Sequence, residues 1–461
     1  MLEKQENKMI NMPILVTKIV STLKQAHPSI STEILLTVTI SKLFEMFSAK
    51  RICFNESGNI QIPNWFSLVF LPSGGGKDRL VDNLDKLVLK DFFNWFTEKG
   101  NEAIEKCDNE NYKKFKLINE VQDATTEGLA LLGKMMKDIN FGSIYVKISE
   151  FGLYIKNGDN RKKQFLGDLC HLYSNKIPNK VIKSEIFRDE ITGIPTNVLA
   201  YSDYTLFLND IKSYFEKILN TGYCRRFIIN FQEKIKLSST YLSDEQERQI
   251  YEELEQVGYS LFQLFKNIAD KSCYKLLPSA KTILNQYKIR NNTLHNKEEN
   301  PLLQRELNSR ELKALKLSCL FAILNHPKEL VINETDIEQA ISAIDFLSQD
   351  FKRFLKYEPA KDDKYQQIFK YWLEHVGKEF SKGELMNILI SRYGFSREPL
   401  RRNLHNELYV LYDIARDNDY TILKNKTKNK NGSVYSLVPY EFQMNTRQSF
   451  ICDCGKKNWW D

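Results

Sequence analysis

The sequence predicts an α/β protein in which a parallel sheet flanked by helical regions is followed by a small separate domain. Three observations lead to this prediction. Short apolar runs alternate with helical patterns between residues 60 and 235. The pattern is helical almost throughout from 241 to 357. A charged segment with a proline at 358–363 then precedes a final unit that ends near residue 440.

Composition excludes several classes of protein without identifying a partner. The chain has 461 residues, 27% charged and 42% hydrophobic residues, and a formal net charge of +7. These values exclude a disordered chain, a collagen and a coiled coil. No apolar run approaches the ~20 residues of a membrane-spanning helix, the first residues do not resemble a signal peptide, and the eight cysteines form no CxxC pair. We therefore expect a cytoplasmic protein with reduced cysteines and no membrane partner.

The chain divides into five predicted regions. Apolar residues at helical spacing predict two helices before residue 50, with Ser31 or Thr32 capping the second. Continuous apolar runs predict buried strands at 64–71, 143–149 and 195–201. The predicted boundaries are 1–58 for an N-terminal helical region, 59–240 for the sheet core, 241–357 for a helical lid domain, 364–440 for the C-terminal domain and 441–461 for a tail.

The segment Leu71-Pro-Ser-Gly-Gly-Gly-Lys-Asp78 is the strongest local signal in the sequence. A buried strand precedes it and a helical pattern follows it, as in the phosphate-binding loop (P-loop) of nucleotide-binding proteins. Glycines let backbone N–H groups converge on phosphate oxygens, and Lys77 would reach the outer phosphates. The predicted nucleotide ligands in this segment are Ser73, Gly74, Gly75, Gly76, Lys77 and Asp78.

The segment departs from the common P-loop pattern at two positions. Leu71 stands in place of the first glycine, and Asp78 stands in place of the Ser or Thr that usually ligates Mg²⁺. A carboxylate at position 78 could bind Mg²⁺ directly or through a water, but it also places negative charge near the phosphates. A glycine-rich turn without a nucleotide is the alternative interpretation.

The predicted strand at 143–149 ends in a candidate catalytic acid. Glu150 follows that strand directly, at the end where ligands bind in open α/β sheets. We expect Glu150 to activate a water molecule or to hold Mg²⁺ together with Asp78. Ser149 occupies the position before it, where a second acid is usual. The alternative is a surface glutamate at a strand end.

Two more segments end in groups that suit a phosphate. The strand at 195–201 is followed by Ser202 and Asp203, either of which could sense the terminal phosphate. Arg225 and Arg226 follow a predicted helix end and precede an apolar segment. An arginine in such a place can stabilise phosphoryl charge across a subunit interface, as an arginine finger does. A surface arginine pair in a turn is the alternative for the second segment.

The order of these motifs resembles that of a known family. IPNWFSLVFLPSGGGKD, DATTEGL, a strand ending in SEFG, NVLAYSD and GYCRRF follow one another between about residues 30 and 355. This order is similar to that of the helicase-type ATPase domain of phage, plasmid and mobile-element primase-helicases, which are superfamily 3-like. The resemblance implies a P-loop AAA-like core that binds ATP and Mg²⁺. It also implies that Lys77 binds phosphate, that Glu150 fills the Walker B role, and that Arg226 is the finger or sensor arginine.

The same resemblance implies an assembly and a partner. Such proteins form hexameric rings that move along DNA, so a homo-oligomeric ring is implied. Members often carry Asp after the P-loop lysine, which suits Asp78, whereas Ser149 departs from the family pattern. Only about 60 residues precede the P-loop strand. We therefore expect any priming to come from a separate primase chain.

Residues 364–440 have the pattern of a winged-helix domain. Helices are predicted at Tyr365–Val376, at Lys382–Arg392 after a cap by Ser381, and from Ser396 onward, followed by two strands around a lysine-rich loop. Arginines early in the third helix and lysines on the loop suit DNA phosphates. The predicted DNA contacts are Arg397, Arg401, Arg402, Asn403, Lys424, Lys426, Lys428 and Lys430. A protein-docking domain is the alternative.

Three functions are compatible with the sequence. The leading hypothesis is an ATP-dependent DNA helicase or translocase that acts in replication of a phage or mobile element. The second is a nucleotide-binding DNA-docking adaptor of weak or no activity, such as a replication initiator or a subunit of a phage-defence complex. A small-molecule kinase is the third, but it leaves the C-terminal domain unexplained. The tail, with Cys452, Cys454, Trp459 and Trp460, suggests a partner-binding end.

Overall fold

The structure of the chain is a computed structural model with two compact units. The first comprises Met1–Leu206 and Ile211–Tyr357, and the second comprises Phe207–Asp210 and Glu358–Asp461. None of the helices in the described part of the chain is long and apolar enough to span a bilayer. The structure describes residues 11–56, 58–72, 75–114, 117, 119–122, 126–156, 160–174, 176–177, 191–203, 209–235, 242–357, 361–393, 395, 404, 408–426 and 433–439.

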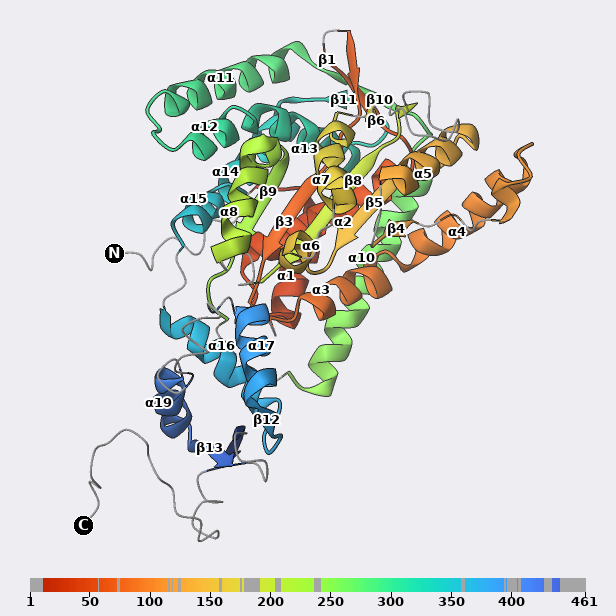
Figure 1. The fold of residues 1–461 in the computed structure, drawn as a ribbon. Coiled ribbons are helices and arrows are strands. Elements are labelled where there is room, and N and C mark those ends of the chain that lie inside the picture. Colours follow the sequence, from red (N-terminus) through yellow and green to blue (C-terminus); the bar gives the residue numbers. More distant parts are fainter. Residues whose placement is uncertain are drawn as a thin grey trace. The chain divides into compact units, whose positions relative to one another are not determined.

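A five-stranded parallel sheet forms the centre of the first unit (Figure 1). Its strands, in order across the sheet, are β4 (Glu120–Val121), β5 (Ile144–Ile148), β8 (Thr196–Ser202), β3 (Phe66–Phe70) and β9 (Phe227–Phe231). Every residue of β3, β8 and β9 is buried, which explains why these strands are continuous apolar runs in the sequence. All neighbouring strands are parallel, so the predicted α/β class with a parallel sheet is confirmed.

Helices and short turns connect the strands of this sheet. After β3 come α3 (Lys77–Asn83), η1 (Leu84–Val88), α4 (Lys90–Glu105) and η2 (Tyr112–Lys114), and α5 (Thr126–Asp138) joins β4 to β5. Between β5 and β8 lie α6 (Phe151–Lys156), α7 (Asn160–Leu172) and the hairpin of β6 (Lys176–Ile177) and β7 (Ile191–Thr192). Between β8 and β9 lie α8 (Asn209–Ile218), η5 (Leu219–Tyr223) and α9 (Cys224–Arg226).

The two predicted N-terminal helices are present as α1 (Ile14–Ala26) and α2 (Thr32–Ser48). The backbone N–H of Ile34 donates to the hydroxyl of Ser31 at 3.4 Å, so Ser31 is the cap of α2. Every residue of α2 from Ile34 onward is buried. The helix packs against β3, β8 and β9, and it therefore belongs to the core of the first unit.

The region predicted as a helical lid contributes two strands to a second sheet that the sequence did not predict. Its helices are α10 (Asp244–Lys266), α11 (Pro278–His295), α12 (Pro301–Leu307), α13 (Arg310–Asn325), α14 (Glu334–Leu347) and α15 (Gln349–Lys356). Two short strands in it, β10 (Cys273–Leu276) and β11 (Val331–Ile332), pair with β1 (Cys53–Glu56) and β2 (Asn59–Gln61) in the order β11-β10-β1-β2.

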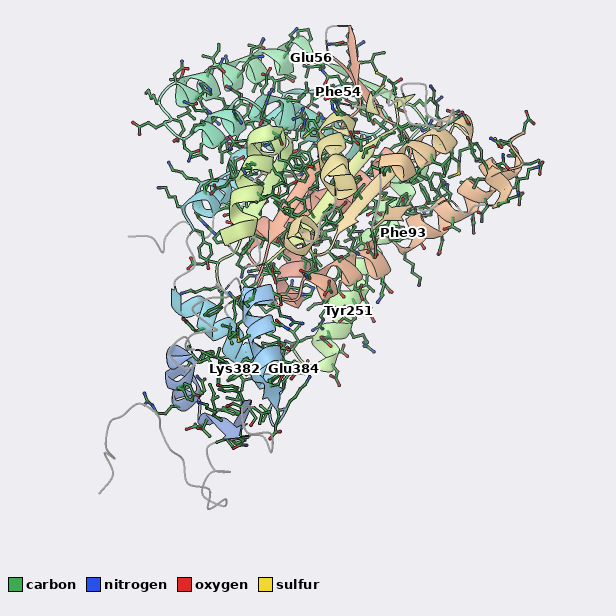
Figure 2. All side chains as sticks on the ribbon, viewed as in Figure 1. Phe54, Glu56, Phe93, Tyr251, Lys382 and Glu384 are labelled. Carbon is green, nitrogen blue, oxygen red and sulfur yellow. The ribbon has the colours of Figure 1, made fainter. Side chains whose placement is uncertain are left out.

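This second sheet joins parts of the chain that are far apart in sequence. Phe54 of β1, marked in Figure 2, pairs with Tyr274 of β10, and both side chains are fully buried. The boundaries predicted near residues 58 and 240 consequently fall inside one compact unit.

The second unit combines helices with a three-stranded antiparallel sheet of β12 (Phe380–Ser381), β14 (Ser433–Pro439) and β13 (Tyr420–Lys426), in that order. Ser381 and Glu384, the latter marked in Figure 2, form a reciprocal cap: Glu384 N–H donates to the Ser381 hydroxyl at 3.2 Å, and Ser381 N–H donates to the Glu384 carboxylate at 2.8 Å. Its elements are α16 (Lys361–Leu373), β12 (Phe380–Ser381), α17 (Lys382–Tyr393), α19 (Tyr409–Asp417), β13 (Tyr420–Lys426) and β14 (Ser433–Pro439).

Helix α19 was not predicted, and most of the helix predicted from Ser396 onward lies outside the described residues.

Candidate functional site

Three strands of the parallel sheet end side by side in the segments that the sequence singles out. Phe70 of β3 is in register with Ser202 of β8, and Ile148 of β5 is in register with Ala200 of β8. Because these strands are parallel, the loops after β3, β5 and β8 emerge at the same edge of the sheet. This carboxyl edge is where ligands bind in open α/β sheets.

Gly75 and Gly76, the described glycines after β3, lead directly into α3. Gly75 N–H donates to the carbonyl of Pro72 at 2.9 Å, and a Cβ on Gly75 would lie 2.6 Å from the side chain of Leu71. Gly76 has a φ of +79°, in the left-handed region that favours glycine. Side chains at these two positions would close or strain the turn. Ser73 and Gly74, two of the predicted ligands, lie outside the described residues.

Lys77 and Glu150 are in direct contact at this edge. The Lys77 ammonium forms an ion pair with the Glu150 carboxylate and also donates to the carbonyl of Ser149 at 3.1 Å. The Lys77 side chain is 18% exposed and that of Glu150 is 44% exposed. The pair is therefore open to solvent, and a ligand could replace either partner.

Ser202, the last residue of β8, links the two loops that carry the ion pair. Its backbone carbonyl accepts from Leu71 N–H at 3.0 Å, and its hydroxyl accepts from Gly152 N–H at 3.2 Å. The side chain is 1% exposed. In this structure Ser202 fixes the start of the glycine-rich segment relative to Glu150, a positioning role that the sequence did not suggest.

Asp78 lies in the first turn of α3 with its side chain exposed. Together with Glu150 it gives the edge two carboxylates. Mg²⁺ in nucleotide sites is held by one or two carboxylates and by phosphate oxygens, so this donor set fits Mg²⁺ bound with a nucleotide. Within the described part of the chain, His, Cys, Asp and Glu form no cluster of three that would hold a metal ion without such a ligand.

Sequence reasoning missed two contacts that join α3 to neighbouring helices. The guanidinium of Arg79 forms an ion pair with Glu247 of α10 and donates to the hydroxyl of Tyr251, marked in Figure 2, at 3.2 Å. His27 at the end of α1 lies 3.1 Å from the side-chain nitrogen of Asn83. Burial, together with the positive charge of Arg79, lowers the pKa of His27 to about 4, so this ring is neutral at pH 7.

Gln232, just after β9, holds the loop between α1 and α2 against the same edge. Its side-chain oxygen accepts from Ser31 N–H at 2.8 Å, and its side-chain nitrogen donates to the Ser29 carbonyl at 2.8 Å. Ile30, between them, lies 4.0 Å from where a Cβ on Gly76 would be. A polar residue directly after a buried strand was the available signal for this contact.

Arg225 and Arg226 lie at the opposite edge of the sheet from Lys77. They end α9, immediately before the first residue of β9. Since β9 is parallel to β3, its beginning is at the amino edge, whereas the glycine-rich segment follows the end of β3. The structure therefore keeps both arginines away from the Lys77–Glu150 pair of their own chain.

Little of the predicted DNA surface falls within the described residues. Lys424 lies on β13 with its side chain exposed, and Lys426 is the last residue of that strand. The remaining predicted DNA contacts lie outside the described residues, namely Arg397, Arg401, Arg402, Asn403, Lys428 and Lys430. The tail from residue 441 onward also lies outside them.

Comparison with known proteins adds no relative. No protein-family model matches the chain, and a search of curated proteins finds no significant match.

Proposed function

We propose that the protein is a P-loop ATPase that drives movement along DNA, as a helicase or translocase, and that it works as a ring of identical subunits. The observation that carries the proposal is the contact between Lys77 and Glu150. It joins a lysine at the end of a glycine-rich turn to an acid at the end of another strand, which are the two parts that ATP hydrolysis needs at one place.

The partly exposed ion pair suggests how the chain's own residues would work. A nucleotide phosphate would compete with Glu150 for the ammonium of Lys77. Its binding would free the Glu150 carboxylate to orient a water molecule and accept its proton. Asp78 and Glu150 are the carboxylates that would hold Mg²⁺, and bound Mg²⁺ would offset the negative charge of the phosphates.

The order of the strands supports a role for Ser202 in the same cycle. Because β8 lies between β3 and β5, a displacement of the loop after β3 would pass to Gly152 through the two hydrogen bonds of Ser202. The sequence prediction of Ser202 as a phosphate sensor stays a prediction, since its hydroxyl is bonded within the chain.

The DNA part of the proposal rests on the second unit. Its helices and antiparallel hairpin are compatible with a winged helix, and the predicted basic residues would bind phosphate rather than read sequence. The ring and its hexameric form, the separate primase and the setting in a phage or mobile element come from the family resemblance alone.

ATP hydrolysis with and without DNA tests the proposed function. We expect the unaltered protein to hydrolyse ATP faster when DNA is added, and Lys77→Ala to lose at least about 100-fold of that rate. Lys86→Ala is the matched control, because Lys86 is 72% exposed and pairs with Asp82 on the surface. Equal rates in the Lys77→Ala and Lys86→Ala variants would contradict the proposal.

One observation favours the adaptor as a second candidate. Position 149, where a second acid is usual, holds a serine whose carbonyl is bonded to Lys77. A site with one acid fewer could bind ATP without turning it over. ATP binding that depends on Lys77, with no hydrolysis even when DNA is present, would support the adaptor over the motor.

A further inference from the structure

The two adjacent arginines before β9 differ sharply in their surroundings. Arg225 has an exposed side chain, whereas Arg226 is partly buried. The resemblance points to Arg226 as the finger arginine, but a finger must leave its own chain to reach a neighbour's phosphate. The environment of each arginine therefore indicates which of the two can reach a phosphate bound by a neighbouring subunit.

Arg226 is built into its own chain. Its terminal nitrogen Nη1 donates to the carbonyl of Gly222 at 3.1 Å, and its buried Nε has no hydrogen-bond partner among the described residues. Gly222 has a φ of +112°, and a Cβ at that position would collide with the Arg226 guanidinium. The backbone of η5 is thus shaped around Arg226, and pulling the side chain out would leave the Gly222 carbonyl without this partner.

The charge of Lys316, near Arg226, is also fixed within the fold. Lys316 of α13 is 2% exposed, lies 3.3 Å from the centre of the Tyr173 ring and donates to the Tyr173 carbonyl at 3.3 Å. Burial, with a smaller contribution from the nearby Arg226, holds the pKa of Lys316 well below its usual range. Arg226 therefore faces a packed interior on one side.

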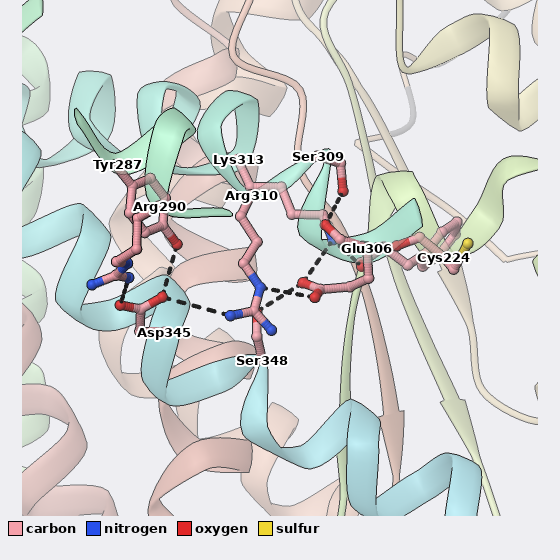
Figure 3. A network of polar contacts seen from close by, with 10 residues as sticks. Cys224, Tyr287, Arg290, Glu306, Ser309, Arg310, Lys313, Asp345 and Ser348 are labelled. Carbon is pink, nitrogen blue, oxygen red and sulfur yellow. Dashed lines mark hydrogen bonds and ion pairs between the residues drawn. The ribbon is translucent and has the colours of Figure 1, made fainter. Parts of the chain in front are cut away.

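Arg225 lies on the short helix α9, whose backbone is fixed by hydrogen bonds from Lys313. The ammonium of Lys313 donates to the carbonyls of Cys224 at 3.4 Å and Phe227 at 2.9 Å, one on each side of the arginine pair. Lys313 is in turn 3.8 Å from Glu306, which also pairs with Arg310 at 2.8 Å (Figure 3). The network fixes the backbone of α9 while the side chain of Arg225 stays on the surface.

Geometry excludes the site of the same chain as the target of Arg225. Strand β9 alone runs four steps from Phe227 to Phe231, roughly 13 Å at 3.3 Å per residue, and the glycine-rich segment lies beyond the end of the neighbouring strand. A phosphate that meets Arg225 must therefore be bound by a second copy of the chain.

We propose that Arg225 is the arginine that contacts the terminal phosphate bound by the neighbouring subunit, and that Arg226 is a positioning residue that shapes η5 and α9. This inference rests on the proposed function. The guanidinium of Arg225 would stabilise the charge that develops on the transferred phosphoryl group. Arg226 would act only through the backbone of η5 and α9, which carries Arg225.

Substitutions in the full-length protein separate the two roles. Arg225→Ala is expected to lower kcat for ATP hydrolysis by about 1,000-fold or more, with an unchanged melting temperature. Arg226→Ala is expected to lower the melting temperature, and the folded fraction of Arg226→Lys is expected to keep kcat within about 10-fold. Arg248→Ala on the exposed surface of α10 is the control. A large loss of kcat in Arg226→Lys together with normal kcat in Arg225→Ala would overturn the inference.

Mixing two inactive variants tests the action between subunits. Lys77→Ala supplies an intact Arg225, and Arg225→Ala supplies an intact Lys77, so their mixture is expected to regain part of the hydrolysis rate that each lacks alone. A mixture of Lys77→Ala with Arg226→Lys is expected to show no such gain beyond the activity of the Arg226→Lys subunits. No gain in the first mixture would contradict a contact between subunits.

A readout that needs no hydrolysis distinguishes failure of this inference from failure of the proposed function. Sedimentation should show ATP, but not ADP, promoting self-association of the unaltered protein, and Arg225→Ala should lose this difference while still binding ATP. ATP binding that survives in Lys77→Ala would refute the nucleotide site itself. Binding that depends on Lys77, with ATP-promoted association intact in Arg225→Ala, would refute only the role of Arg225.

Discussion

Two lysines of the first unit pair with acids in very different settings. Lys42 of α2 is 1% exposed and lies 2.8 Å from Glu45, 2.7 Å from Asp85 and 3.8 Å from Glu120. Lys77 at the carboxyl edge is 18% exposed, and within the described part of the chain its carboxylate partner is Glu150, which is itself 44% exposed. Among the described residues, Lys42 thus lies in a largely buried cluster with three acids, and Lys77 in a partly exposed pair with Glu150.

The difference separates an ion cluster that holds the fold from an ion pair that is available to a ligand. The Lys42 ammonium also lies 4.7 Å from the ring of Tyr145, a fully buried residue of β5. No ligand could replace Lys42 without leaving buried carboxylates uncompensated. At Lys77, by contrast, a phosphate could take the place of one exposed carboxylate at small cost to the fold.

The largest expected effect concerns the largely buried cluster. Lys42→Met keeps the length of the side chain but leaves Glu45, fully buried, and the two neighbouring acids without their central cation. We expect the free energy of unfolding, measured by urea denaturation at pH 7, to fall by roughly 3–5 kcal/mol. Lys86→Met at the exposed surface should change it by less than about 1 kcal/mol. Similar changes in the two variants would break the distinction.

His27, which contacts Asn83 of α3 next to the candidate site, is a buried titratable group whose charge also affects the stability of the fold. Its folded pKa of about 4 is below the unfolded value of 6.5, so the unfolded chain binds a proton more readily. The stability that the neutral ring provides is therefore complete above pH 6.5 and is lost as the pH falls towards 4. The loss amounts to roughly 3 kcal/mol at 1.36 kcal/mol per pKa unit.

The difference between the unaltered protein and His27→Gln isolates this effect from the titration of carboxylates. We expect the free energies of unfolding of the two proteins, measured in urea, to converge or to change order as the pH is lowered from 7 to 4. Only the unaltered protein has a buried imidazole whose protonation is less favourable in the folded state than in the unfolded state. Parallel curves over this range would show that His27 is not held neutral by the fold.

These two regions also show what the sequence could predict. The strands β3, β5 and β8 and the edge at which Lys77 and Glu150 meet followed from buried apolar runs, because parallel strands must end together. Lys42 and Glu45 are three residues apart on a helix, a spacing that also occurs in ordinary surface ion pairs. Only the packing of Asp85 and Glu120 around them makes the cluster a buried one.

Contacts between distant segments account for most of what the sequence missed. Cys53 of β1 is opposite Cys273 of β10 in the strand register, although Cys273 lies 220 residues further along the chain. The four residues of β10 are too few to give a clear strand pattern. The hydrogen bonds of the Gln232 side chain with the backbone of Ser29 and Ser31 likewise join segments about 200 residues apart. The difference in burial between Arg225 and Arg226 depends on Lys316 and Gly222, which no local pattern reveals.

Glu150 should separate catalysis from binding within the partly exposed pair. Glu150→Gln removes the carboxylate that would accept a proton, so we expect kcat for ATP hydrolysis to fall by about 100-fold or more. Since the same change frees the Lys77 ammonium from its ion-pair partner, ATP binding should be equal or tighter. Weaker binding with unchanged kcat would assign Glu150 to the ligand-binding surface alone.

The smallest expected effect completes the contrast between the two lysines. Lys77→Met removes one partly exposed ion pair, and exposed pairs contribute little to stability. We expect the free energy of unfolding, in the absence of nucleotide, to change by less than about 1 kcal/mol. A loss comparable to that of Lys42→Met would make Lys77 a structural residue and would weaken the case for a ligand there.

Equilibrium binding of ATP with Mg²⁺ tests the central claim most directly. Calorimetric titration would compare the unaltered protein, Lys77→Ala and the surface control Lys86→Ala, each shown to be folded by its unfolding curve. We predict that Lys77→Ala loses at least about 10-fold in affinity, equivalent to 1.4 kcal/mol, and that Lys86→Ala binds like the unaltered protein. Equal affinities in all three proteins, or binding in none, would contradict a nucleotide site at the Lys77–Glu150 pair.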